Sequence, residues 1–190
     1  MRIILGVCVL HLIMIFSAYG HSPWAQHHVY RQKHLLILSA RDDSASYPVS
    51  KKLVELINSF EPSARARPAR AKNLKRAYKL LKTRQLQFAL LSKHNLDMMR
   101  FSSGKLKGNE EVNLQTIYVF GDLEFVSVDG FPDDLAYSLT EGLVRSHHEL
   151  TQMVSLENLI DYETLHPGSR KLLQEIELGN YEKNHNNTLE

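Results

Sequence analysis

The stretch from His34 to Leu91 constrains the fold most, because β-compatible apolar runs alternate in it with segments whose apolar residues recur at helical spacing. Leu35–Leu38 and Phe88–Leu91 are unbroken apolar runs, as expected for strands covered on both faces by helices. This order predicts a βαβαβ unit of parallel strands. The loops that follow parallel strands emerge at one edge of the sheet, where ligands usually bind.

Two helices are predicted within this unit. The first begins at the Tyr47-Pro48 step, because proline is favoured in the first turn of a helix. Its buried stripe is predicted to consist of Val49, Leu53, Leu56, Ile57 and Phe60. The second helix begins after Asn73, which is a natural N-cap residue. Its buried face is predicted to consist of Leu74, Ala77, Tyr78 and Leu81.

The chain beyond Leu91 completes a single α/β domain. Residues 95–101 are predicted as a short helix, and the two β runs on either side of Gly121-Asp122 as a hairpin or a bent strand. The later helices are predicted after Pro132, with Leu135, Leu139 and Leu143 as a stripe, at 156–160, and at 169–178. We therefore expect helices on both faces of a mixed sheet of about five strands. The strands should lie near residues 34–40, 63–69, 86–92, 113–120 and 123–129.

The N-terminus resembles a secretory leader. Residues 3–19 are nearly all apolar, follow Arg2 and end at Ala18-Tyr19-Gly20, which favours cleavage before His21. A membrane anchor is the alternative, but the apolar stretch is short for a bilayer span. The only cysteine, Cys8, lies within the leader, so we expect no disulfide in the mature chain. We assign residues 1–20 to a signal peptide, 21–33 to an N-terminal arm, 34–178 to the α/β domain and 179–190 to a disordered polar tail.

The overall charge is nearly balanced, with 23 Lys and Arg against 21 Asp and Glu and a formal net charge of +2. No global field therefore draws the chain to nucleic acid or lipid. One segment is an exception, because nine cations occur in it without an acid. They are Arg65, Arg67, Arg70, Lys72, Lys75, Arg76, Lys79, Lys82 and Arg84. These cations predict either a solvated outer face or an anion-binding surface near the start of the second helix.

Catalysis has little support in the sequence. It contains no glycine-rich phosphate loop, no nucleophile elbow and no metalloprotease helix. Asp42 and Asp43 are paired carboxylates in a strand-end loop, but adjacent acids alone do not indicate acid-base chemistry. We therefore expect a protein that is not an enzyme.

The predicted mature N-terminus offers a metal-binding alternative. The freed amine and imidazole of His21, together with His27 and His28 or with His34, are ligand types suited to copper or zinc. The simpler interpretation is an arm that Pro23 and Trp24 anchor to the domain. We expect no cofactor, and we retain a copper site at His21, His27 and His28 as the alternative.

Five short stretches resemble the TAXI-type solute-binding receptors of TRAP transporters. They are Tyr47-Pro48, Asn73-Leu74, QFALLS at 87–92, AYSLTEGLVRSHHEL at 136–150 and LHPGSRKLLQE at 165–175. The resemblance implies a single lobe of the periplasmic-binding-protein type II fold in a periplasmic transport protein. It also implies that Ser44, Ser46, Tyr47, Asn73 and Ser92 contact a small anionic or zwitterionic solute.

The departures from that family shape the functional hypothesis. The loop after the first strand is Ala40-Arg41-Asp42-Asp43-Ser44-Ala45-Ser46, where the family has a glycine-rich loop that contacts the ligand. The chain also passes almost directly from residues 125–128 to the late helix, which leaves no room for a full second lobe. We therefore expect either weak solute binding at the strand-end loops or docking of a periplasmic or membrane transport partner at the same edge.

Overall fold

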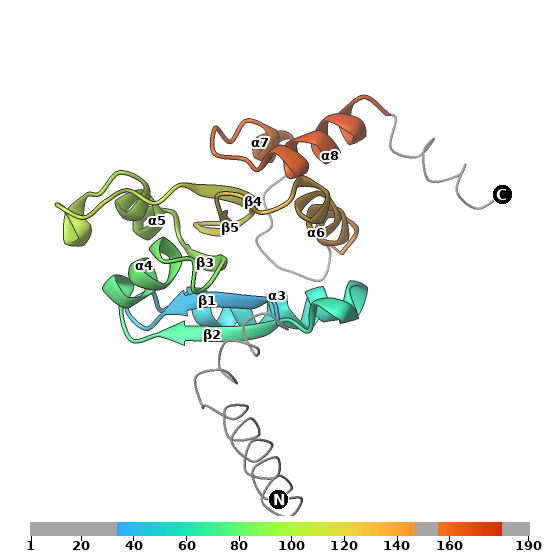
Figure 1. The fold of residues 1–190 in the computed structure, drawn as a ribbon. Helices are drawn as coiled ribbons and strands as arrows, with labels where there is room; N and C mark the ends of the chain where they lie inside the picture. Colours follow the sequence, from blue (N-terminus) through green and yellow to red (C-terminus); the bar gives the residue numbers. More distant parts are fainter. Residues whose placement is uncertain (1–33, 147–155, 180–190) are drawn as a thin grey trace, which may run out of the picture. The chain divides into compact units, whose positions relative to one another are not determined.

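The structure is a computed structural model that describes residues 34–146 and 156–179 (Figure 1). All contacts discussed below lie within the compact unit that begins at Leu35. Its five-stranded sheet has the order β2-β1-β3-β5-β4. The strands are β1 (Leu36–Ala40), β2 (Arg67–Ala71), β3 (Phe88–Ser92), β4 (Leu114–Phe120) and β5 (Leu123–Val128). Since β1 is parallel to β2 and β3, whereas β5 is antiparallel to β3 and β4, the predicted mixed α/β fold is confirmed.

Helices connect the strands and follow the sheet. They are α3 (Ser46–Phe60), α4 (Leu74–Lys82), α5 (Lys93–Arg100), α6 (Asp133–Arg145), α7 (Leu156–Ile160) and α8 (Pro167–Glu177). Two short 3₁₀ turns lie at η2 (Pro62–Ala64) and η3 (Gly104–Leu106). Asn73 caps α4 as predicted, because its side-chain oxygen accepts a hydrogen bond from the Arg76 amide at 2.9 Å.

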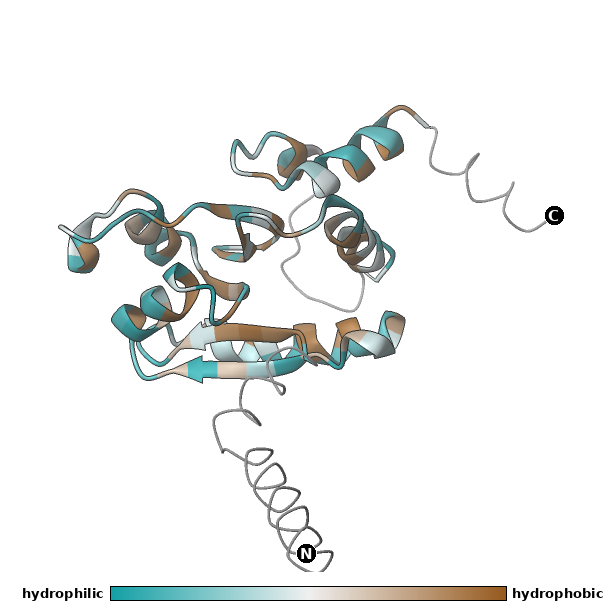
Figure 2. Cartoon of the chain, in the orientation of Figure 1, coloured by the Kyte–Doolittle hydropathy of each residue, from teal (hydrophilic) through white to brown (hydrophobic). Residues whose placement is uncertain are grey.

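Two hydrophobic cores lie on opposite faces of the sheet. Successive strand residues enter different cores, as Ile37 and Leu38 do in β1 and Phe88 and Ala89 do in β3. The first core is closed by α3, α6 and α8, and the second by α4 and α5. Figure 2 shows β1 as apolar along most of its length, whereas β2 and α4 carry many polar residues. The unbroken apolar runs in the sequence therefore have the predicted cause, which is burial on both faces.

Two details of the predicted elements are wrong. The second strand was expected at 63–69 but begins at Arg67 and ends at Ala71. The Glu61 side chain caps a 3₁₀ turn at Pro62–Ala64, and Arg65 has a left-handed φ of 45°, so the chain cannot extend earlier. Leu135 was expected in the buried stripe of α6 but is 50% exposed, because Ala136 takes that place.

The two edges of the sheet are protected differently. Beyond β4, the Thr116 amide donates to the Thr164 carbonyl at 2.7 Å, and the His166 amide donates to the Thr116 carbonyl at 2.8 Å. Residues 164–166 thus form a strap along that edge. The β2 edge instead carries Pro68 and exposed arginines, which discourage strand addition. Within 34–146 and 156–179, no helix is long and apolar enough to cross a bilayer.

Candidate functional site at the carboxyl edge of the sheet

The topology places a switch point of the sheet at the carboxyl end of β1. This strand leads into α3 on one face of the sheet, whereas its neighbours β2 and β3 lead into α4 and α5 on the other face. The loops of adjacent strands therefore diverge at this point. Open α/β sheets bind ligands at such a topological switch point.

The carboxylate of Asp43 occupies this position. Asp43 is only 6% exposed, and its Oδ2 accepts hydrogen bonds from the Ser92 amide at 2.7 Å and from Nδ2 of Asn95 at 3.0 Å. Both donors lie at the N-terminus of α5, where exposed amides attract negative charge. The first loop thus places its own anion where an anionic ligand would bind.

The neighbouring Asp42 acts in the same way on α4. Its Oδ2 accepts a hydrogen bond from the Leu74 amide at 3.1 Å, at the first residue of that helix. A second amide in the first turn of α4 is also engaged, because the Asn73 side chain accepts a hydrogen bond from the Arg76 amide. Asp42 and Asp43, for which the sequence predicted no role, therefore connect the loop after β1 to the starts of α4 and α5.

The structure brings the five predicted solute contacts to this edge but leaves few of them available. Ser46 is buried, and its hydroxyl donates to the Asp43 carbonyl at 2.8 Å. Tyr47 is half-buried, with the Arg70 guanidinium 4.6 Å from its ring centre. Ser44 is exposed in the loop, and Asn73 is exposed as the cap of α4. Ser92 is half-buried, and its amide is bound to Asp43.

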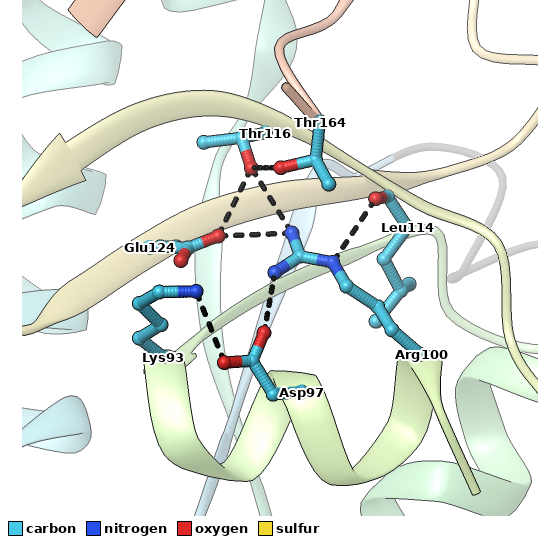
Figure 3. Close-up of polar contacts among 7 residues, drawn as sticks. All are labelled: Lys93, Asp97, Arg100, Leu114, Thr116, Glu124 and Thr164. Atoms are coloured by element: carbon cyan, nitrogen blue, oxygen red, sulfur yellow. Dashed lines mark hydrogen bonds and ion pairs between the residues drawn. The ribbon is translucent and has the colours of Figure 1, made fainter. Parts of the chain in front are cut away.

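A buried ionic cluster, which sequence reasoning missed, lies between α5 and the β4–β5 hairpin (Figure 3). Arg100 Nη2 donates to Glu124 Oε2 at 2.9 Å, and the two side chains are 6% and 1% exposed. Arg100 also donates to the Thr116 hydroxyl at 3.0 Å and, over 3.4 Å, to the Leu114 carbonyl. The signal in the sequence was Glu124, the one charged residue of a mostly apolar strand, because a charge buried there needs a partner.

The strap beyond β4 completes this cluster. The hydroxyls of Thr116 and Thr164 lie 2.8 Å apart, and the Thr116 hydroxyl also donates to Glu124 Oε2 at 3.0 Å. Burial, followed by the charge of Glu124, raises the pKa of the nearby Tyr162 hydroxyl. The other carboxylate oxygen, Glu124 Oε1, is buried without a hydrogen-bond partner among the described residues. The cluster therefore joins α5, the hairpin and the strap through one ion pair.

Among residues 34–146 and 156–179, no group of three or more His, Cys, Asp or Glu side chains is arranged to hold a metal ion. The alternative copper ligands His21, His27 and His28 lie outside the described residues.

Comparisons of the chain with protein-family models, with curated proteins and with solved structures gave no match.

Proposed function

We propose that this chain is an exported, non-catalytic protein of the solute-binding type whose strand-end edge docks a partner protein. Support for export comes from the leader-like residues 1–20, and support for the lobe comes from the stretches that resemble TAXI-type receptors. The mixed sheet with a switch point at β1 is compatible with this class.

The observation that carries the proposal is the position of Asp43. A free carboxylate solute would have to displace a buried carboxylate that already accepts two hydrogen bonds. It would also approach the negative charge of Asp42. Docking of a partner at the same edge meets neither obstacle, because Ser44 and Asn73 are exposed and need not move.

Solute binding and docking can be separated by a thermal-shift screen. The mature protein and its Asp43→Ala variant are each tested with amino acids and small carboxylates. We expect no stabilisation of the native protein and a gain in the variant, because removal of the carboxylate frees the Ser92 amide. A hit on the native protein that is lost in Asn73→Ala would instead establish a solute receptor and contradict docking.

A partner is then sought by capture from a periplasmic extract. Ser44→Trp places a bulky side chain on the exposed loop at the carboxyl edge, and Gln87→Trp places one at the exposed position before β3 as a matched control. We expect specific capture by the native protein and by Gln87→Trp, but not by Ser44→Trp. Capture that is equal in all three proteins would exclude this edge as the docking site.

A further inference from the structure

Most cations of the segment singled out in the sequence are exposed along β2, the turn after it and α4, and these are called the basic surface below. Between Glu61 and Asp97 the chain contains no acidic residue. The members of this basic surface are all solvent-exposed, and they are Arg67, Lys72, Lys75, Arg76 and Lys79. Arg70 lies instead over the Tyr47 ring of α3, on the other face of the sheet. Figure 2 shows β2 and α4 with many polar residues, in contrast to the apolar β1 beside them.

Among the described residues, the basic surface has no carboxylate counter-charge. The cations just beyond it are paired, Lys82 with Glu110 at 2.7 Å and Arg84 with Asp129 at 3.8 Å. In the parts of the chain that the structure describes, none of the five members of the surface forms an ion pair with a carboxylate. The charge of this surface is therefore available to an anion from outside the chain.

The two cations in the first turn of α4 oppose the stability of that helix. Lys75 and Arg76 lie in its first turn, where the helix dipole favours acids, and the first turn contains no acid. Lys75 and Lys79 are also four residues apart on one face, a spacing at which like charges repel. Lys79 suits the dipole in the last turn, but folding of the helix gives no reason for Lys75 and Arg76, and an acidic partner would offset both unfavourable terms.

We propose that the basic surface on β2 and α4 binds an acidic segment of the partner protein, an inference that rests on the proposed docking function. A protein is favoured over a lipid surface because membrane-bound helices need an apolar face. The large hydrophobic side chains that are exposed among the described residues are Phe101, Leu135 and Leu178, which lie outside β2 and α4.

The test uses a fluorescent oligoglutamate peptide of about 20 residues as the probe, with binding followed by anisotropy at several salt concentrations. The test variant is Lys75→Glu/Lys79→Glu. The control, Lys105→Glu/Lys107→Glu, makes the same change in net charge at two other exposed lysines, in and beside η3. We expect the test variant to weaken peptide binding by about tenfold or more and the control by less than about twofold.

Thermal unfolding supplies a second readout. Glu at position 75 suits the helix dipole in the first turn of α4, whereas Glu at position 79 opposes it in the last turn, so the two effects offset each other and the test variant should unfold at about the same temperature as the native protein. Lost binding without lost stability supports a binding role. A marked fall in the unfolding temperature would show that these lysines serve folding and would contradict the inference.

Three outcomes would overturn the inference. Equal loss in the test and control variants would mean that only net charge matters. Loss of binding to phosphatidylglycerol vesicles without loss of peptide binding would assign the surface to lipid. If Lys75→Glu/Lys79→Glu leaves partner capture intact while Ser44→Trp abolishes it, the docking function stands and the basic surface is not its acidic contact.

Discussion

The carboxylate of Asp43 accepts a hydrogen bond from the Ser92 amide at 2.7 Å, across 49 residues of sequence. This bond joins the loop after β1 to the start of α5 at the switch point of the sheet. The same carboxylate accepts a hydrogen bond from the Asn95 side chain, so one buried side chain holds two groups at the start of α5. At the edge where open α/β sheets bind ligands, these hydrogen-bond donors are thereby already occupied by a side chain of the protein itself.

Removal of the Asp43 carboxylate should destabilise the fold. Asp43→Ala leaves the Ser92 amide and the Asn95 side chain without their acceptor, so we expect a loss of about 2–3 kcal/mol in the free energy of unfolding. Asp42→Ala is the matched control in the same loop and should cost less, because Asp42 is exposed. Urea unfolding followed by circular dichroism measures both, and equal losses would contradict a special role for Asp43.

The buried ion pair should respond differently to single and double substitution. Arg100→Met leaves Glu124 buried without its cation, and we expect a loss of about 3–5 kcal/mol in unfolding free energy. Arg100→Met/Glu124→Leu removes both charges, while Thr116 and Thr164 still bond to each other. The double variant should therefore be more stable than the single one in urea unfolding. A double variant as unstable as Arg100→Met would show that the pair itself supplies net stability.

Gly168 should not tolerate any side chain. A Cβ built at Gly168 would lie 1.9 Å from the backbone oxygen of Asp133, where α8 meets the start of α6. Because the obstacle is backbone, we expect Gly168→Ala to destabilise the protein by about 3 kcal/mol. Gln174→Ala, at an exposed position of the same helix, should change the unfolding midpoint little. Similar midpoints for the two variants would refute this close contact.

The stability of the fold should depend on the protonation of His166. Burial lowers the pKa of His166 below its ordinary value of 6.5, against opposing effects of the Phe131 carbonyl and Asp133. Its Nδ1 also accepts a hydrogen bond from the Gly168 amide at 3.2 Å, which an added proton would prevent. The unfolded chain therefore binds the proton more readily, so stability is complete above about pH 6.5 and falls as the pH decreases toward the folded pKa.

Melting temperatures at pH 7.5 and pH 5.0 test this dependence. His166→Asn keeps an acceptor for the helix cap but does not titrate, so its pH dependence should be smaller than that of the native protein. His94→Asn, at an exposed histidine, is the control and should keep the native dependence. An unchanged dependence in His166→Asn would assign the effect to other groups.

The copper alternative remains a prediction about the mature N-terminus. If His21 binds Cu(II) through its amine, one residue added ahead of it should abolish tight binding, because the amine then moves out of chelating reach. Calorimetry of the mature protein and of the extended protein measures this difference. Equal affinities would remove His21, His27 and His28 as a copper site.

The sequence by itself determined the type and order of the secondary-structure elements. The apolar runs at β1 and β3, the helical stripe after Tyr47 and the N-cap at Asn73 all predicted the elements that the fold contains. These features depend on short-range spacing, so they can be predicted from neighbouring residues. The strand-end loops also gather at one edge, which follows from parallel strands alone.

Only the tertiary structure decided which polar groups at that edge are available. Asp43 bonds to residues 49 and 52 positions away, and Arg100 to Glu124 across 24 positions. Such partners depend on how distant elements pack, which no local pattern records. For the same reason, the helical spacing of Leu135 did not reveal that this residue lies on the exposed side of α6. A buried acid or base needs a partner, and only the packed fold determines which residue that partner is.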